Sequence, residues 1–301
     1  MVYIDMGEMG SMDTRQEVLH RVKELPPLST STVELLSIMS EDDKDLHKII
    51  RVVECDAGLT ARVLRIVNSP AFGLMESITS IHRAVSYLGQ KMLVGIALDA
   101  AVGSILRQPL KGYEDSKGLL WEHNLRAAIG SKEVARFAKQ DISPDIAFTG
   151  GILHDIGKAV LSDFLSGSAG NIISKIDTGE SKDYLAGEQQ TVGIDHSVVG
   201  YELARKWNLA SPLPDIIRFH HNPSKAEGAV KAVVYAVHLG DIISMMGGSG
   251  TGSDDLMYYL DPHFHAYIEI SERQLEELML KVQFEFERIK KCIFDREGKD
   301  S

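Results

Sequence analysis

A histidine stands directly beside an aspartate, at His154 and Asp155, inside the otherwise apolar segment 151–158. Burying such a polar pair costs free energy unless its charges and hydrogen-bonding groups are matched, and a metal ion bound by both side chains would match them. Hydrogen bonds within a protein core also explain a single doublet of this kind. Further residues able to bind metal flank the doublet along the chain, at His123, His196, His220, His221 and Asp241.

Imidazole and carboxylate ligands suit iron, manganese and zinc. An aspartate can bridge two ions, and two-metal sites with ions ~3.5–4 Å apart are a known solution for the hydrolysis of phosphate esters. We therefore expect divalent ions at this set of residues, one or two per chain, with Fe or Mn favoured and Zn or Ni as alternatives. His238 lies three residues before Asp241 on the same predicted helix face, and we interpret it as a core histidine.

Nearly every long segment has the apolar spacing of a helix, and strand-like alternation is hard to find. Each candidate ligand falls on or at the end of a predicted helix in the second half, and facing helices of a bundle can direct such side chains to one interior point. Further helices begin at Ser31, Ser143-Pro144 and Pro212. The remaining predicted helices cover residues 13–25, 45–54, 59–68, 81–88, 90–106, 121–139, 195–207, 229–246 and 272–296.

The neighbours His220 and His221 set a geometric condition. Adjacent side chains on a helix point ~100° apart, so both reach one site only near the end of a helix. Asn222-Pro223 supplies such an end. The segment 112–118, with its Gly, Asp, Ser and Lys residues, is the best candidate for a domain boundary.

The composition restricts the function. A formal net charge of -11 over 301 residues argues against non-specific binding to nucleic acid or to anionic membranes. It leaves room for a phosphorylated ligand, because metal ions reverse the field locally. The two cysteines are far apart, the N-terminus has no secretion signal, and no apolar stretch approaches the ~20 residues of a membrane span. We expect a cytoplasmic protein that binds neither nucleic acid nor membrane.

These motifs resemble two related families. Residues 121–123 and 154–158, with the later histidines and Asp241, resemble the HD superfamily of metal-dependent phosphohydrolases. The upstream segments 25–28, 56–64, 68–73 and 78–89 resemble the HDOD family, the HD-related output domain of bacterial signalling proteins. The resemblance covers roughly residues 18–245. It implies an all-helical fold and a regulatory role in bacterial signal transduction, with no defined substrate.

The resemblance also implies roles for single residues. His123 would be the first metal ligand, His154 and Asp155 the central pair with Asp155 bridging, and Asp241 the final aspartate. HD relatives that hydrolyse cyclic di-GMP add three histidines, which His196, His220 and His221 match in order. Lys158 would contact a phosphate or an attacking water, although a solvated lysine after Gly157 needs no further explanation. HDOD proteins often lack the full ligand set, and this chain keeps it.

Two departures limit the comparison. His221 is followed by Asn222-Pro223 where the cyclic di-GMP enzymes have an acidic residue and a Gly-Tyr-Pro element. Leu119 stands one helical turn before His123, where some of them have a glutamate. The first departure argues against specificity for cyclic di-GMP, and the second against a third metal.

We predict an all-α fold in which an N-terminal HDOD helical subdomain, residues 13–115, packs on an HD-like metal-binding domain, residues 116–300. The leading hypothesis is a signalling protein whose HD-like half binds metal, where a phosphorylated small molecule or a signalling protein acting in trans shifts the contact between the halves. One alternative is an active phosphohydrolase or phosphodiesterase on a nucleotide or cyclic nucleotide, with Asp155 and Lys158 as catalytic residues. The other is a protein-interaction module whose histidines are relics.

Overall fold

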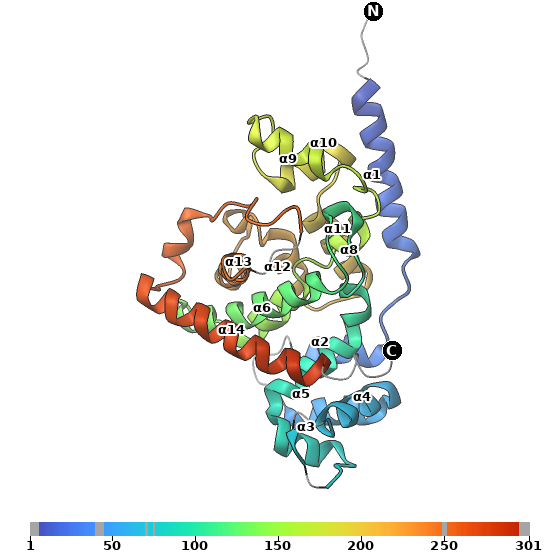
Figure 1. Ribbon diagram of the computed structural model, residues 1–301, viewed down its shortest axis with the longest axis vertical. Helices are drawn as coiled ribbons and strands as arrows, with labels where there is room; N and C mark the ends of the chain where they lie inside the picture. The colour runs from blue at the N-terminus through green and yellow to red at the C-terminus, as the bar shows by residue number, and fades with distance from the viewer. Residues whose placement is uncertain (1–5, 40–44, 70–71, 75, 249–251, 295–301) are drawn as a thin grey trace, which may run out of the picture.

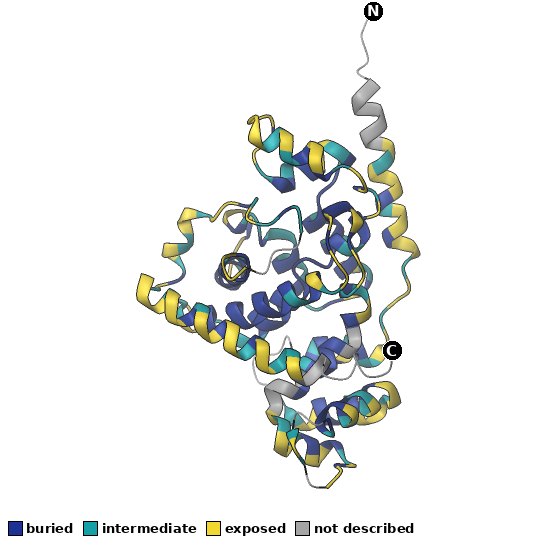
Figure 2. Cartoon of the chain, in the orientation of Figure 1, coloured by how far each residue is buried: buried dark blue, intermediate teal, exposed yellow. Residues whose placement is uncertain are grey.

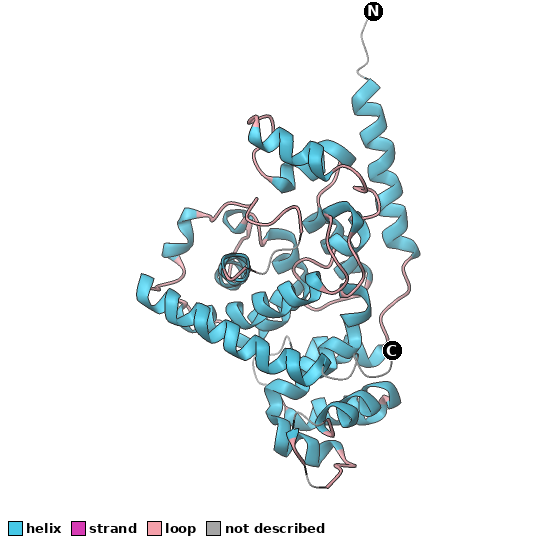
Figure 3. Ribbon diagram, viewed as in Figure 1, coloured by secondary structure: helices cyan, strands magenta, loops and turns pink. Residues whose placement is uncertain are grey.

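Helices form most of the computed structural model, which describes residues 6–39, 45–69, 72–74, 76–248 and 252–294. Within these ranges there is no β-strand, and one isolated antiparallel bridge joins Ala138 to Ile268 (Figure 3). The all-α prediction is confirmed. No helix among the described residues is long and apolar enough to cross a membrane.

The helices follow one another along the chain without long connections in most places (Figure 1). They are α1 (Met6–Glu24), α2 (Thr30–Met39), α3 (Leu46–Cys55), α4 (Ala57–Val67), α5 (Ile81–Leu106), α6 (Leu119–Val134), α7 (Pro144–Leu153), α8 (Lys158–Leu161), α9 (Ala169–Asp177), α10 (Tyr184–Val192), α11 (His196–Lys206), α12 (Leu213–Phe219), α13 (Val230–Met246) and α14 (Glu272–Phe294).

Several helix starts lie where the sequence predicts them. Ser143 accepts a hydrogen bond from the backbone nitrogen of Ile146 and caps α7, with Pro144 at the first helical position. Asp195 caps α11 in the same way through the backbone nitrogen of Val198, at 2.9 Å. Each cap satisfies a backbone N–H that has no partner inside the helix.

Other boundaries differ from the prediction. The helix expected over 121–139 is α6, which ends at Val134, and a short 3-10 helix, η3 (Ala135–Phe137), follows it. The chain leaves the helix here because Lys139 and Glu269 pair by backbone hydrogen bonds with Tyr267 and Phe137, both at 2.8 Å.

Segments 81–88 and 90–106 join as α5, with a break at Gly89, where φ is 72°. Glycine adopts this conformation without steric cost. Helix α1 begins at Met6 instead of residue 13, in a stretch where methionine and glutamate favour helix. Helices α9 and α10 were not among the predicted helices, and α10 lies between an Asp183 cap and Gly193 in the left-handed conformation.

Helix α6 occupies the centre of the second half, where it packs against α7, α13 and α14. Almost all of its residues are buried (Figure 2). The contacts are backbone to backbone: a Cβ added to Gly240 on α13 would lie 2.4 Å from the backbone nitrogen of Ser131 on α6. A Cβ added to Gly151 on α7 would lie 2.5 Å from Cα of Ala128 on α6. These approaches set the three helices at a fixed mutual distance.

Helix α1 packs on α8, α10 and α11, so it lies on the second half of the chain, away from α3 and α4 (Figure 1). The end of α11 holds the segment that leaves α1. Lys206 donates to the backbone carbonyls of Val22, Lys23 and Leu25, and Trp207 Nε1 donates to the carbonyl of Pro26 at 3.2 Å. The domain boundary between residues 115 and 116 stays a prediction.

Candidate metal centre

The residues predicted as metal ligands lie in one buried cluster enclosed by helices of the second half. They are His123 on α6, His154 and Asp155 directly after α7, His196 at the start of α11, His220 and His221 directly after α12, and Asp241 on α13. Their side chains are no more than 4 % exposed. The cluster divides into two groups of nitrogen and oxygen atoms that share Asp155.

The first group surrounds Oδ2 of Asp155. This oxygen lies 3.7 Å from Nε2 of His123 and 3.4 Å from Nε2 of His154. Asp241 closes the group with Oδ1, which lies 3.0 Å from His123 Nε2 and 3.6 Å from His154 Nε2.

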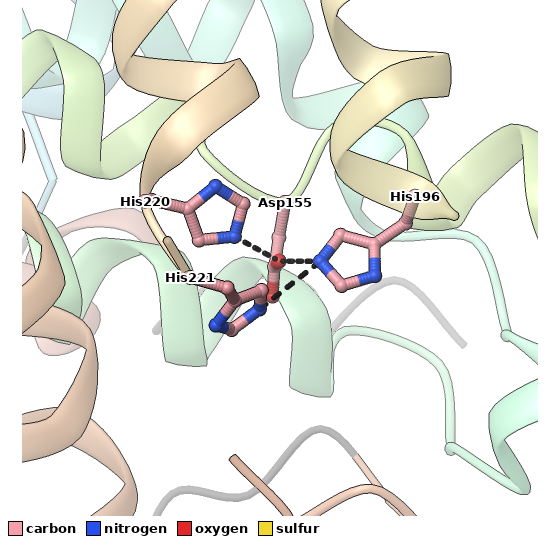
Figure 4. A group of neighbouring side chains, drawn as sticks. All are labelled: Asp155, His196, His220 and His221. Atoms are coloured by element: carbon pink, nitrogen blue, oxygen red, sulfur yellow. Dashed lines mark hydrogen bonds and ion pairs between the residues drawn. The ribbon is translucent and has the colours of Figure 1, made fainter. Parts of the chain in front are cut away.

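The second group surrounds the other oxygen of the same carboxylate (Figure 4). Oδ1 of Asp155 lies 3.2 Å from Nε2 of His196 and 3.5 Å from Nε2 of His220. Nε2 of His221 lies 3.1 Å from Nε2 of His196. Atoms that bind one ion at ~2.0–2.2 Å are themselves roughly 3–3.5 Å apart, so both groups have the spacing of a ligand shell. Asp155 is placed to bridge.

The end of α12 lies where His220 and His221 require a helix to end if both are to reach one site. The helix stops at Phe219, and the rings of His220 and His221 lie 4.1 Å apart, centroid to centroid, beyond the regular turns. Both rings therefore face the same cluster, as the prediction from Asn222-Pro223 required.

Backbone carbonyls fix the tautomer of two of these histidines. Nδ1 of His154 donates to the carbonyl of Gly151 at 2.8 Å, and Nδ1 of His220 donates to the carbonyl of Ile217 at 2.8 Å. With the proton on Nδ1, the lone pair of a neutral ring is on Nε2, which is the atom that faces Asp155.

Side chains fix the tautomer of two more, His196 and His123. Nδ1 of His196 donates to the carboxylate of Glu188 at 2.9 Å, and Nδ1 of His123 lies 3.2 Å from the hydroxyl oxygen of Ser244. The Ser244 hydroxyl donates to the carbonyl of His123 at 3.1 Å, so it accepts from the ring. Histidine ligands of metals are oriented in this way by a partner on the second nitrogen.

His238 provides a contrast within the same core. Its Nδ1 donates to the carbonyl of His220 at 2.7 Å, and its Nε2 accepts from the backbone nitrogen of Asp261 at 2.9 Å. Both ring nitrogens are used, which agrees with its interpretation as a core histidine.

Several polar atoms of the cluster are buried and make no well-formed hydrogen bond to the described part of the chain. They are Nε2 of His154, Oδ1 of Asp155, Nε2 of His220, Nδ1 of His221 and Oδ2 of Asp241. Buried polar atoms without partners are rare in folded proteins and require an explanation. Binding of metal would provide this explanation, because imidazole and carboxylate groups in this arrangement bind divalent metal ions.

The electrostatics of the cluster follow from burial and close charges. Burial alone would raise the pKa of Asp155, but His154 and Lys158 hold that pKa well below its usual range. Burial would lower the pKa of His196, but the carboxylates of Glu188 and Asp155 raise that pKa to about 10. Burial and the charges of neighbouring histidines lower the pKa of His220 to about 4. Any ion would compete with protons for these groups.

Lys158 is buried, and the alternative of a solvated lysine is wrong. Its ammonium nitrogen lies 2.7 Å from Oδ2 of Asp155 and 2.6 Å from Oδ2 of Asp254, and the side chain is 1 % exposed. Against burial, these two carboxylates raise the pKa of Lys158, so the side chain stays charged beside the bridging aspartate.

The sequence interpretation missed the partners of the candidate ligands. Glu188 holds His196 and also accepts from the hydroxyl of Tyr113 at 2.6 Å, and Asp254 holds Lys158. Tyr258 stacks on His221, with ring centroids 3.9 Å apart and planes 15° from parallel. No spacing along the chain relates these residues to the doublet, so only the fold could reveal them.

Gly157 allows the turn after the doublet to lie against α11. A Cβ on this residue would be 1.9 Å from the carbonyl oxygen of His196 and 2.6 Å from the backbone nitrogen of Gly200. Glycine at this position therefore brings the bridging aspartate and the first residue of α11 together.

Comparison with known proteins gives a family and a fold. The HDOD domain family matches residues 25–223. An HDOD domain protein of unknown function from Geobacter sulfurreducens has a TM-score of 0.71 and 20% identity, covering 95% of this chain and 99% of that one. A candidate signal transduction protein from Marinobacter aquaeolei gives a TM-score of 0.73 and 19% identity over 97% of this chain and 67% of that one.

A candidate phosphohydrolase from Shewanella amazonensis gives a TM-score of 0.65 and 23% identity over 92% of this chain and 97% of that one. An uncharacterized curated protein of Treponema pallidum is 24% identical over 222 residues, which are 73% of this chain and 42% of that protein. The chain thus spans less than half the length of this relative. The solved structures share the fold of this chain.

Proposed function

The chain belongs to the HDOD domain family, and we propose that it is a bacterial signalling protein whose buried His/Asp cluster binds two metal ions and, through them, a phosphorylated small molecule. The observation that carries the proposal is the position of Asp155. One oxygen of its carboxylate faces His123 and His154, and the other faces His196 and His220.

The residues that would hold the ions follow from the two groups. His123, His154, Asp155 and Asp241 would hold one ion, and Asp155, His196, His220 and His221 the other. When bound, divalent ions attract and orient phosphate oxygens. The chain itself contributes the ring orientations, a buried setting, and the ammonium of Lys158 beside Asp155, which would pair with a phosphate oxygen. Iron or manganese suits this ligand set, with zinc and nickel as alternatives.

The proposed output is a shift in the contact between the two halves, passed to a signalling protein in trans. A cavity of about 510 Å³ supports this idea, because the segment after α1, helix α4 and Trp207 at the end of α11 meet there without filling the space. The related candidate signal transduction protein from Marinobacter aquaeolei points in the same direction.

Metal analysis of the purified full chain tests the proposal. We expect bound iron or manganese in the wild type, the loss of one of the two ions in His154→Ala, and the retention of both in His47→Ala, an exposed histidine outside the cluster. Chelation should also lower the melting temperature of the wild type, since an ion that binds only the folded state stabilises it. A wild type that stays free of metal after supply of Fe, Mn, Zn and Ni would contradict the proposal.

A second candidate is a metal-dependent phosphohydrolase or phosphodiesterase. Lys158 favours it, since a buried cation beside a metal pair would stabilise charge that develops on a phosphate oxygen. The candidate phosphohydrolase from Shewanella amazonensis shares the fold. A panel of nucleotides and cyclic nucleotides separates the two functions: metal-dependent turnover in the wild type, lost in both Asp155→Ala and Lys158→Ala, would establish the enzyme.

A further inference from the structure

The walls around the donor cluster, the candidate ligands described above, differ in secondary structure. On most sides the cluster is enclosed by helices whose backbones touch at Gly151, Gly157 and Gly240. On one side it is covered by residues 252–258, which we call the strap. Over its length the strap has turns and no helix. Its residue Leu256 has a φ of 56° and is 64% exposed.

Two side chains of the strap reach into the site. Asp254, which is fully buried, places Oδ2 2.6 Å from Nζ of Lys158. The hydroxyl of Tyr258 donates to the same Oδ2 at 2.7 Å, and the Tyr258 ring lies flat on His221. The strap therefore contacts both the cation and one of the candidate ligands.

The carboxylate of Asp254 pairs with the cation that an anionic ligand of the site would contact. Lys158 is the cation beside the bridging aspartate, and its ammonium lies between Asp155 and Asp254. A phosphate group carries more charge than a carboxylate and has three oxygens, so it can bind a metal ion and Lys158 at the same time. Asp254 would then pair with Lys158 only in the absence of such a group.

A cavity adjoins the strap at Tyr258. Tyr258 and His221 line a cavity of about 200 Å³ together with Tyr259, Asn222 and the aliphatic-stemmed Lys182, whose side chain is 70% exposed. Of the candidate ligands, His221 is the one that lines this cavity. Movement of the strap would give a ligand in this cavity access to the other candidate ligands.

We propose that Asp254 is an internal competitor for the phosphate group of the ligand, and that the ligand binds by displacing Asp254 from Lys158 and moving the strap. This inference rests on the proposed function, because it takes the cluster to hold metal. It adds that the affinity for phosphate is set by the Lys158–Asp254 ion pair and by the Tyr258 hydroxyl that holds it.

Titration calorimetry of the metal-loaded full chain with inorganic phosphate tests the inference. We expect Asp254→Asn to bind phosphate at least about tenfold more tightly than the wild type, because the competing charge is removed and the shape is kept. Tyr258→Phe keeps the ring on His221 and removes only the hydroxyl, so a smaller gain is expected. Asp99→Asn removes another buried carboxylate, which pairs with Arg62 and Arg107, and should leave the phosphate affinity unchanged.

Metal content, measured on each protein first, separates this inference from the proposed function. A wild type without metal contradicts the proposed function. If the wild type and Asp254→Asn are loaded and bind phosphate equally, or the variant binds more weakly, the inference alone is wrong and the ion pair is structural. If Asp254→Asn fails to fold or to load, Tyr258→Phe decides: unchanged phosphate affinity in that variant overturns the inference.

Discussion

Glu188 holds His196 at two points: its carboxylate accepts from the ring Nδ1 at 2.9 Å and from the backbone nitrogen at 2.8 Å. The glutamate lies in the middle of α10 and the histidine begins α11, so one carboxylate fixes both the ring and the start of the helix that carries it. This pair is buried, with both side chains 0% exposed.

We predict that Glu188→Gln lowers the metal affinity of the chain by about 10- to 100-fold while the fold is kept, since a partner on the second nitrogen orients a histidine ligand and raises its basicity. Competition with a chelator of known affinity measures the effect. Glu133→Gln, which removes a carboxylate paired with Lys281 and Arg136, is the matched control and should change little. Equal affinities in wild type and Glu188→Gln would refute the role of this pair.

Substitutions in the two donor groups should differ in how many ions are lost. His123→Ala should reduce the metal content from about two ions per chain to about one, and His220→Ala should do the same for the other group. Asp155→Asn, which changes the shared carboxylate, should remove both. Elemental analysis with native mass spectrometry gives the counts, and His238→Gln is the control for a buried histidine whose nitrogens already have partners. A single ion lost in Asp155→Asn would exclude bridging.

Gly157→Ala should disturb the cluster without changing any candidate ligand. The added methyl would meet the backbone of His196 and Gly200, and overpacking of this kind costs about 1–3 kcal/mol. Thermal unfolding should show a lower melting temperature together with reduced metal content. Gly170→Ala on α9, where a Cβ meets nothing within 4 Å, should be neutral or stabilise by about 0.5–1 kcal/mol. Equal behaviour of the two variants would argue against the contact.

The folding stability should depend on pH through Asp115, in a direction that the raised pKa of this residue determines. Burial and the charge of Asp254 raise the pKa of Asp115 to about 6. A carboxyl with a raised pKa in the folded chain lowers stability once the pH exceeds its unfolded value of ~4, and this cost is complete above the folded value. Asp115→Asn should therefore raise the melting temperature at pH 8, and the gain should shrink as the pH falls below about 6 and disappear below ~4. A gain that is the same at both ends would show that charge is not the cause.

The helices, two of their starting points and the candidate ligands could be predicted from the sequence by local rules. Apolar periodicity predicts the helices around the cluster, the caps at Ser143 and Asp195 predict where two of them begin, and the order of the histidines predicts which side chains meet. The His220–His221 pair was predictable because Asn222-Pro223 ends a helix there.

The rest depends on contacts between distant segments. Glu188 and Asp254 carry no local signal, and their partners lie on other elements. The early end of α6 follows from the backbone hydrogen bond between Phe137 and Glu269, which helix propensities cannot predict. Helix α10 is short and its apolar residues give little periodicity to detect. Helix α9 does have the helical spacing, at Ala169, Ile172, Ile173 and Ile176, and the prediction overlooked it.

Helix α11 is a strut, a rigid connection between the donor cluster and the segment that follows α1. Its first residue, His196, belongs to the donor cluster, and its far end carries Lys206 and Trp207, which hold the segment after α1. With eleven residues the strut is ~16 Å long, and a packed helix of that length moves as one body. Any displacement of His196 that includes its backbone must therefore also move Leu25 and Pro26. The donor cluster and the segment that leads to the other N-terminal helices are thus coupled through α11.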